Sequence, residues 1–356
     1  MRVYIKCLFL GFLLSACNGD QSDSQSAQRT QYKWTLVTSW PKNLPGLGVT
    51  SERFAEEVYA MSGGRMQISV YGAGELYPAL DVFDVVAQGK VEMGHSAAYY
   101  WQDRLPAAVF FSALPFGMAA KDLNAWLYLG GGLALWRELY APYNLLPYPG
   151  GNTDAQMGGW FNKKINTMDD FKQLKMRLPG LGAKVLEMAG GLPLALPADQ
   201  LYQALRDGDI DAVEWVGPYN DLAFGFHKVA KYYYYPGWHE PSTTLEFIIN
   251  KEAFATLPDD LKRIIENATK VVNQETLSEY VVYNVEALTI LANEHGVDIV
   301  PFPPQVLAQL KDYSLTVIEQ LANKDPSFAK VLNSYRRFQF GVSKNNQLKL
   351  APTSLE

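Results

Sequence analysis

Apolar and polar residues alternate with two different periods along residues 32–152 of the chain. A period of two residues is typical of strands, and a spacing of three or four residues is typical of amphipathic helices. The short connections between these segments predict a parallel sheet covered by helices. By these patterns we expect strands at 32–38, 66–71 and 91–97, and helices at 50–61, 78–88 and 122–140, the last weakened by the glycines at 130–132.

The same alternation begins again after residue 152, which predicts a second α/β unit. The expected strands 175–178 and 192–196 are each followed directly by proline, a residue that ends regular structure. A cleft between two such lobes is a preferred place for a ligand, and closure about a hinge is the usual motion. The expected strands are 155–162, 175–178, 192–196, 210–213, 229–235 and 243–250, and the expected helices are 183–189 and 197–206.

The last third of the chain is predicted to be mainly helical. Residues 258–294 keep a helical spacing over far more residues than an average helix, so this helix is expected to run along both lobes. Two shorter helices are expected at 304–322 and 326–335. The predicted division is lobe I over 32–152, lobe II over 153–242, a return to lobe I with the long helix over 243–300, and C-terminal helices over 301–356.

The first 17 residues have the features of a lipoprotein signal peptide. Arg2 and Lys6 are followed by an apolar run that is too short to span a bilayer as a mature helix. The run ends in Leu-Ser-Ala-Cys at 14–17, which resembles the bacterial lipobox, so cleavage before Cys17 and lipidation of its sulfur are expected. An ordinary secretory leader is the alternative. Residues 18–31 are polar and typical of a flexible tether.

Composition excludes several classes of function. The 356 residues carry a formal net charge of −6, whereas a nucleic-acid-binding protein selects basic surfaces. The two cysteines are Cys7, within the predicted leader, and Cys17. The mature chain is therefore expected to have no disulfide and no thiolate metal site.

The stretch from Arg206 to Asp221 is where we expect the site to be organised. Gly208 closes a predicted helix, a short buried strand follows, and Glu214 and Trp215 come directly after that strand. Ligands of open α/β sheets bind at the carboxyl ends of strands. A glutamate that simply points into water at the end of a strand is an equally good interpretation of this stretch alone.

Four positions in the second half of the chain are candidates to meet in the cleft: Gln156, Arg177, the pair Glu214–Trp215, and Glu240. The planar guanidinium of arginine suits a carboxylate because it donates two parallel hydrogen bonds. Two glutamates, a glutamine carbonyl and a backbone carbonyl form an all-oxygen set that fits Na⁺ or Ca²⁺. A surface salt bridge between Arg177 and Glu214 or a nearby aspartate is the alternative.

Catalytic motifs are incomplete in this sequence. Residues 94–98 approach a nucleophile elbow but lack its final glycine, and His239–Glu240 lacks the second histidine of a zinc-protease motif. The four histidines show no metal-ligand spacing and are interpreted as ordinary surface or core residues. No complete dinucleotide or phosphate-binding glycine motif is present.

Several segments together resemble the solute-binding proteins of TRAP (tripartite ATP-independent periplasmic) transporters, in the branch that binds 2-oxo acids and lactate. The resemblance covers nearly the whole mature chain and is most specific at the last segments. It is carried by Trp-Thr-Leu-Val-Thr-Ser-Trp-Pro at 34–41, Glu-Met-Gly-His-Ser-Ala at 92–97, Met-Arg-Leu-Pro-Gly at 176–180, Gly-Asp-Ile-Asp-Ala-Val-Glu-Trp at 208–215, Pro-Tyr-Asn-Asp at 218–221 and Tyr-Tyr-Pro-Gly-Trp-His-Glu-Pro at 234–241.

The resemblance implies the two-lobe periplasmic solute-binding fold with a long helix across both lobes. It implies that Arg177 holds the ligand carboxylate and that a Na⁺ or Ca²⁺ ion bridges protein and ligand. The implied metal ligands are Gln156, Glu214, the Trp215 carbonyl and Glu240. Tyr100 and Asn220 match polar contacts to the ligand, Trp215 and Trp238 match aromatic walls, and Trp40 is expected to help set the size of the pocket.

We therefore expect a periplasmic receptor, lipid-anchored through Cys17, that captures a small monocarboxylate and delivers it to the transporter's membrane subunits. The ligand is expected to be a 2-oxo acid such as pyruvate or a lactate-like 2-hydroxy acid, and no catalysis is expected. A homodimer through residues 307–321 is possible by the resemblance, although their apolar face fits ordinary packing equally well. The alternatives are a metal-dependent lyase or hydrolase using Glu214 and Glu240, and a sensor lipoprotein that binds a protein partner.

Overall fold

A computed structural model describes residues 31–349 of the chain. The predicted signal peptide with Cys17, and residues 18–30 of the predicted tether, lie outside the described residues. Within residues 31–349, no helix combines the length and the apolar character that crossing a membrane requires.

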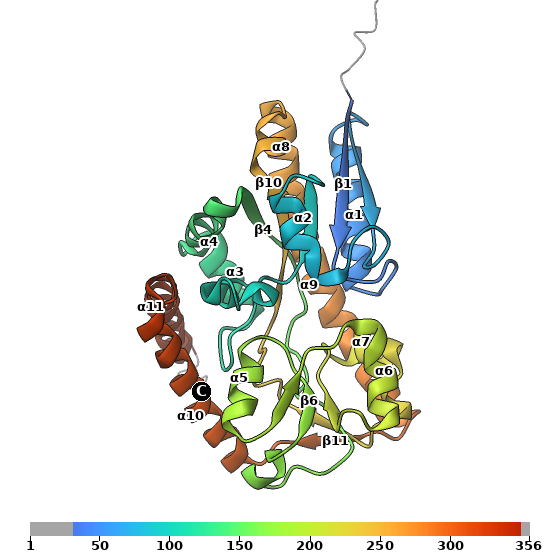
Figure 1. Ribbon diagram of the computed structural model, residues 1–356, viewed down its shortest axis with the longest axis vertical. Helices are drawn as coiled ribbons and strands as arrows, with labels where there is room; N and C mark the ends of the chain where they lie inside the picture. Colours follow the sequence, from blue (N-terminus) through green and yellow to red (C-terminus); the bar gives the residue numbers. More distant parts are fainter. Residues whose placement is uncertain (1–30, 350–356) are drawn as a thin grey trace, which may run out of the picture. The chain divides into compact units, whose positions relative to one another are not determined.

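Lobe I is the part of the chain built on a five-stranded sheet with the order β2-β1-β3-β10-β4 (Figure 1). The strands are β1 (Tyr32–Thr38), β2 (Met66–Tyr71), β3 (Met93–Ser96), β4 (Leu145–Asn152) and β10 (Thr244–Asn250). β1 pairs in parallel with β2 and β3, whereas β10 runs antiparallel to both β3 and β4. The helices of this lobe are α1 (Leu47–Met61), α2 (Val82–Ala87), α3 (Ala120–Tyr128), α4 (Gly132–Tyr140) and α8 (Lys251–Ala255).

Lobe II is built on a six-stranded sheet with the order β11-β9-β5-β8-β6-β7. Its strands are β5 (Gly159–Phe161), β6 (Lys175–Arg177), β7 (Leu192–Leu194), β8 (Ala212–Val213), β9 (Tyr232–Tyr235) and β11 (Asp298–Pro301). β6 pairs in parallel with β7 and β8, while β5 is antiparallel to β8 and β9. Three helices belong to it: α5 (Gly180–Met188), α6 (Ala198–Asp207) and α7 (Pro218–Phe224).

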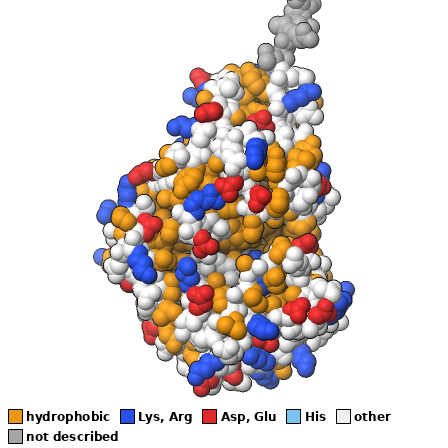
Figure 2. Space-filling model, viewed as in Figure 1, with side chains coloured by type: hydrophobic (Ala, Val, Ile, Leu, Met, Phe, Trp, Pro, Cys, Tyr) orange, Lys and Arg blue, Asp and Glu red, His pale blue; other side chains and the backbone are white. Residues whose placement is uncertain are grey.

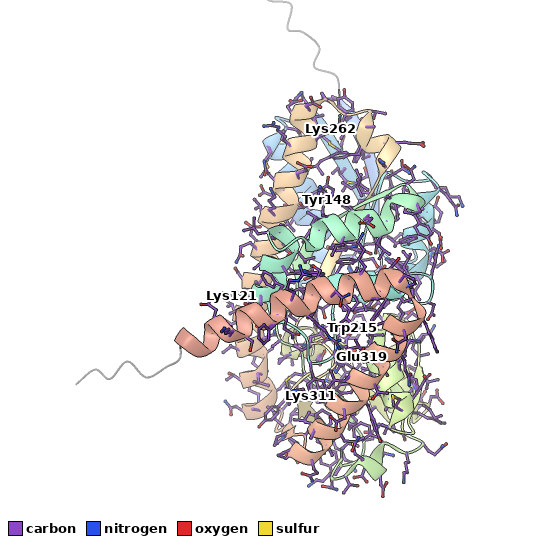
Figure 3. All side chains as sticks on the ribbon, turned by 90° about the vertical axis from the view of Figure 1, so that its left-hand side faces the viewer. Lys121, Tyr148, Trp215, Lys262, Lys311 and Glu319 are labelled. Carbon is purple, nitrogen blue, oxygen red and sulfur yellow. The ribbon has the colours of Figure 1, made fainter. Side chains whose placement is uncertain are left out.

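The 35-residue helix α9 (Asp259–Asn293) connects the lobes, as its length predicts. Its first half packs with α1 under the lobe I sheet through Leu261, Ile265 and Val272, and a later part contacts α7 of lobe II. Helices α10 (Pro304–Lys324) and α11 (Pro326–Lys349) form a second connection along another side (Figure 3). α10 packs against α5 of lobe II, and α11 packs against α3 and α4 of lobe I.

Two features of the sheets differ from the prediction. Both sheets are mixed: β10 pairs antiparallel with β3 and β4 in lobe I, and β5 pairs antiparallel with β8 and β9 in lobe II. No strand is expected over residues 145–152, but these residues form β4, where a Cβ on Gly150 would meet the Phe247 ring at 2.7 Å. Close packing of one strand on another is the reason for glycine here.

Several predicted segments are shorter or divided in the structure. Residues 155–158 form a loop before β5, so Gln156 does not begin a strand. The predicted helix over 122–140 is two helices, because Gly131 adopts a left-handed φ of 93° between them. β7 covers only 192–194 at the edge of its sheet.

A carboxylate lies in the middle of the lobe I sheet. Glu246 of β10 is fully buried and accepts hydrogen bonds from Trp101 Nε1 at 2.6 Å and Tyr140 Oη at 2.9 Å. Burial raises the pKa of Glu246 from 4.5 to about 7, against the two donors, which lower it. The folded protein therefore keeps a proton between these pH values that the unfolded chain releases, and its stability falls as the pH rises through this window.

We expect Glu246→Gln to remove this pH dependence. The difference in free energy of unfolding, variant minus wild type, should increase by roughly 1–3 kcal/mol from pH 5 to pH 8. The reason is that the amide carries no charge to bury, whereas the carboxylate of the wild type becomes ionised over this range. Urea unfolding of both proteins at the two pH values measures the difference, in which the other titrating groups cancel. A difference that does not change with pH would contradict the raised pKa.

Candidate functional site

A cavity of about 340 Å³ lies between the two lobes. Lobe I contributes Trp40, Tyr99 and Tyr100 to its wall, and lobe II contributes Arg177, Trp215 and the segment 193–198. Figure 2 shows the surface hollowed between the upper and lower parts, with hydrophobic side chains gathered there. The cavity thus has an apolar wall and one buried guanidinium.

Arg177 and Glu214 form an ion pair that is almost completely buried. Arg177 ends β6 and Glu214 follows the neighbouring strand β8, so the pairing of the two strands brings their side chains together. Arg177 Nη1 donates to Glu214 Oε2 at 3.0 Å and to the Glu214 backbone carbonyl at 2.7 Å. The alternative salt bridge between Arg177 and Glu214 is therefore present, but the two side chains are 5% and 1% exposed, so it is buried and not at the surface.

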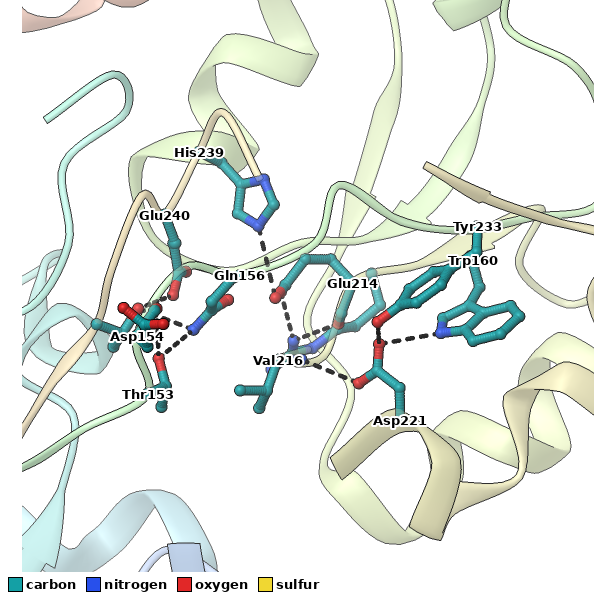
Figure 4. A network of polar contacts seen from close by, with 12 residues as sticks. Thr153, Asp154, Gln156, Trp160, Glu214, Val216, Asp221, Tyr233, His239 and Glu240 are labelled. Atoms are coloured by element: carbon teal, nitrogen blue, oxygen red, sulfur yellow. Dashed lines mark hydrogen bonds and ion pairs between the residues drawn. The ribbon is translucent and has the colours of Figure 1, made fainter. Parts of the chain in front are cut away.

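The side chains of Gln156 and Glu240 are linked through the hydroxyl of Thr243 (Figure 4). Gln156 Nε2 donates to Thr153 Oγ1 at 3.1 Å and to Thr243 Oγ1 at 2.9 Å. The Thr243 hydroxyl in turn donates to Glu240 Oε2. Because these bonds use the amide nitrogen of Gln156 and one oxygen of Glu240, the remaining oxygen of each side chain is free for another partner.

Three buried side-chain oxygens of this cluster have no hydrogen-bond partner within residues 31–349: Gln156 Oε1, Glu214 Oε1 and Glu240 Oε1. A buried acceptor without a partner is unfavourable, and a buried carboxylate more so. Burial raises the pKa of Glu214 to about 8, with Arg177 acting in the opposite direction. Burial and the nearby Glu214 raise the pKa of Glu240 to about 7. This donor set fits a hard cation, which would supply the missing partner and charge.

His239 is a site residue that the sequence analysis missed. It is 1% exposed, and its Nε2 lies 3.5 Å from Glu214 Oε1. One ligand atom from each of Glu214, His239 and Glu240 lies within 4.8 Å of the others. Burial lowers the pKa of His239 to about 4, so the ring is neutral at pH 7. Its position directly before Glu240 was the one available signal, but spacing alone did not separate it from the other histidines.

An aromatic group lies beside Arg177 in the cavity wall. Trp40 of lobe I and Trp215 of lobe II meet edge to face with ring centroids 6.5 Å apart, and Tyr100 lies 5.9 Å from Trp40. The Arg177 guanidinium lies 5.2 Å from the centroid of the Trp215 ring, within the range of a cation–π contact. Trp215 Nε1 is buried and has no hydrogen-bond partner in the described part of the chain. It is therefore a free donor at the wall.

The loop that carries Glu214 and Trp215 is fastened to α7 by a buried aspartate (Figure 4). Asp221 accepts hydrogen bonds from Trp160 Nε1 at 3.0 Å, Tyr233 Oη at 2.8 Å and the Val216 backbone at 3.3 Å. Burial raises the pKa of Asp221 to about 7, against these donors. A loop bound at this point holds Glu214 in place through the backbone.

Three predicted ligand contacts, Gln156, Asn220 and Trp238, lie outside the residues that line the cavity. The amide of Asn220 is bonded to Pro45 and Tyr280, and the ring of Trp238 lies against Phe116 with centroids 6.1 Å apart. Their direct contact with a ligand stays a prediction. Apart from Asn220 and Trp238, the predicted residues come together: Trp40, Tyr100, Arg177 and Trp215 at the cavity wall, and Gln156, Glu214 and Glu240 in the polar cluster.

Other lining residues carried no signal that sequence reasoning could use. Tyr99 is buried at the wall, and residues 193–198 form an apolar rim between β7 and α6. Thr153 and Thr243 orient the metal-site candidates, yet threonine is common in loops and strands. Only the fold places these residues beside the polar cluster.

Comparison with known proteins connects this geometry to a family. The model of the bacterial extracellular solute-binding proteins, family 7 (DctP), matches residues 36–325. A curated relative from Nostoc sp. is 41% identical over 339 residues, which cover 94% of this chain and 92% of the relative. That relative is a monocarboxylate 2-oxoacid-binding periplasmic protein.

Two solved structures of TRAP periplasmic solute-binding proteins have the same fold. The protein from Colwellia psychrerythraea contains calcium and pyruvate, and matches with a TM-score of 0.87 and 39% identity over 90% of this chain and 97% of its own. The protein from Pseudoalteromonas atlantica contains sodium and pyruvate, and matches with a TM-score of 0.87 and 42% identity over 92% of this chain and 100% of its own.

The predicted resemblance and the predicted two-lobe fold are confirmed by these matches. The chain belongs to family 7 of the bacterial extracellular solute-binding proteins, and it is accordingly extracytoplasmic.

Proposed function

We propose that this protein is the receptor of a TRAP transporter and captures a small 2-oxo monocarboxylate, such as pyruvate, together with Na⁺ or Ca²⁺. The observation that carries the proposal is the group of three unpartnered buried oxygens beside the buried Arg177. The 2-oxoacid-binding relative and the two pyruvate-containing structures support the same ligand class. A lactate-like 2-hydroxy acid offers similar oxygen atoms and is the second ligand to test.

The residues have separate roles in this proposal. Gln156 Oε1, Glu214 Oε1, Glu240 Oε1 and the Trp215 carbonyl would hold the cation. When bound, the cation supplies positive charge that can attract a carboxylate and a neighbouring 2-oxo oxygen together. Arg177 would donate to the ligand carboxylate, because Nη1 is occupied by Glu214 while the rest of its guanidinium borders the cavity.

Charge balance explains why both the arginine and the cation are needed. Two ionised glutamates and a carboxylate ligand would place three negative charges in a buried volume, against one positive charge on Arg177. A divalent cation brings this sum to zero, and a monovalent one leaves a single negative charge. One oxygen of Glu214 is bonded to Arg177 and the other is free. The guanidinium and the bound cation would therefore share the carboxylate of Glu214. We therefore expect cation and ligand to strengthen each other's binding.

The same polar cluster does not favour the enzymatic alternative. A lyase or hydrolase using Glu214 and Glu240 has no support among the relatives, which are binding proteins, so we propose capture without catalysis. Tyr100, Trp40 and Trp215 would enclose the ligand.

We further propose that the receptor is anchored through Cys17 and delivers its ligand to the membrane subunits of the transporter. A homodimer through 307–321 lacks support, because Leu310, Val317 and Ile318 on this stretch pack within the chain.

The ligand proposal is tested by titrating pyruvate, and then lactate, into the chain from residue 18 onward while tryptophan fluorescence is recorded. Saturable binding is expected, because Trp40 and Trp215 line the cavity. Arg177→Ala should weaken binding by roughly 2–5 kcal/mol, since it removes a buried partner of a charge. Arg206→Ala, at an exposed ion pair with Asp207, is the matched control and should bind as the wild type does. Equal affinity in Arg177→Ala would exclude the proposed role.

The cation proposal is tested on chelator-treated protein to which Na⁺ or Ca²⁺ is restored. Added cation should raise the melting temperature and tighten pyruvate binding, with a stabilisation of about 2.7 kcal/mol at a cation concentration one hundred times its Kd. Glu214→Gln and Glu240→Gln should lose both effects. Glu246→Gln replaces another fully buried glutamate, whose carboxylate is bonded to Trp101 and Tyr140 of lobe I, and should keep both. An equal affinity for pyruvate with and without the cation would be consistent with a receptor but would contradict the proposed cation bridge.

A further inference from the structure

Asn220 is a fully buried polar residue whose partners are not in the cavity. It lies in α7, which begins three residues after Trp215 and belongs to lobe II. Its Nδ2 donates to the Pro45 carbonyl at 2.7 Å, and its Oδ1 accepts from Tyr280 Oη at 2.6 Å. Pro45 precedes α1 in lobe I, and Tyr280 lies on α9, the helix that contacts both lobes. One amide therefore joins three separate parts of the fold.

The loop of lobe I is shaped for this contact. Gly46 adopts a left-handed φ of 68°, and a Cβ at this position would lie 2.5 Å from Tyr280 Oη. Any other residue would displace either the loop or the tyrosine ring. Glycine thus lets the Tyr280 hydroxyl approach the backbone next to Pro45 and reach Asn220.

A second polar contact joins the same three elements. Glu279 of α9 accepts from Arg53 Nη2 of α1 at 2.7 Å and from Tyr219 Oη of α7 at 3.1 Å. The Tyr219 ring also stacks on Tyr283 of α9 with centroids 5.0 Å apart. α7 is therefore held to α9 on one side, while its Asn220 reaches across to lobe I on the other.

We propose that Asn220 is an inter-lobe latch, which stabilises the closed arrangement of the lobes by binding the Pro45 carbonyl while Tyr280 holds its amide in position. Pro45 and Asn220 belong to different lobes, so rotation of the lobes away from each other separates them. The latch rests on the proposed function in one respect, because it assumes that closure captures the ligand. It adds that affinity depends on a residue that does not line the cavity.

The link from latch to affinity is the population of the closed state. The apparent Kd of a ligand that needs the closed state rises in proportion as that state becomes less populated. A buried hydrogen bond of ordinary strength corresponds to a change of roughly tenfold in such an equilibrium. Asp221, the next residue, binds the Val216 backbone, so movement of α7 also moves the loop that carries Glu214.

The test compares Asn220→Ala with Asn250→Ala. Asn250 is also a buried asparagine, but its Nδ2 donates to the Val86 carbonyl at 2.9 Å and its Oδ1 accepts from the Ala253 backbone at 3.0 Å, all within lobe I. Both variants lose two buried hydrogen bonds, and only one loses a contact between lobes. Tyr280→Phe is a milder second variant that keeps the ring and removes the hydroxyl.

The readout is the distance between the lobes, from pulsed EPR of spin labels on cysteines placed at the exposed Lys90 and Asp199. The chain from residue 18 onward contains no cysteine and includes the whole compact unit that follows Thr30. Asn220→Ala and Tyr280→Phe should shift the distribution toward longer distances without ligand, and Asn220→Ala should raise the pyruvate Kd roughly tenfold. Asn250→Ala should lower the melting temperature and leave distances and Kd unchanged.

The outcomes separate the latch from the proposed function. Wild-type distances in both latch variants, or an equal shift in Asn250→Ala, would overturn the latch. If the wild type binds neither pyruvate nor lactate, the ligand assignment fails, while the distances in ligand-free protein still decide whether Asn220 holds the lobes together. If Asn220→Ala does not fold, the distance distribution of Tyr280→Phe without ligand decides alone whether the latch holds the lobes together.

Discussion

The burial of two glutamates beside one arginine is the constraint on which this site depends. Removing a carboxylate from water is unfavourable unless it gains a partner of opposite charge or several hydrogen bonds. Arg177 satisfies only one oxygen of Glu214, and Thr243 satisfies only one oxygen of Glu240. The remaining oxygens, with that of Gln156, face a shared space in which positive charge is missing. Such a site is suited to binding a cation and an anion together.

The fold produces this arrangement by bringing together ends of segments that are distant in the sequence. Arg177 and Glu214 end neighbouring parallel strands, whereas Gln156 and Glu240 lie in the two crossings between the lobes. Backbone bonds join these crossings, since Gly237 donates to the Gln156 carbonyl at 3.0 Å. Movement of either lobe therefore affects the polar cluster directly.

Helical connections support the lobes at two places. α9 contacts α1 and β4 of lobe I and α7 of lobe II, and the α10–α11 pair contacts α5 of lobe II and α4 of lobe I. The segment before α3 takes part as well: the Phe116 backbone donates to the Trp238 carbonyl, and the Met118 backbone donates to Tyr335 Oη of α11. These connections lie outside the cavity, so they can guide closure while leaving the binding surface free.

The sequence by itself determined most of the local elements, the two-lobe division of the sheets and the positions of Arg177 and Glu214 at the ends of strands. Periodicity and glycine placement act over a few residues, which is why the long helix and the turn at Gly208 were predictable. Only the tertiary structure decided that β10 runs antiparallel, that His239 faces Glu214 and that Asn220 joins the lobes. These outcomes depend on contacts between distant residues and on the direction in which each side chain points. Neither quantity is contained in the local order of apolar and polar residues.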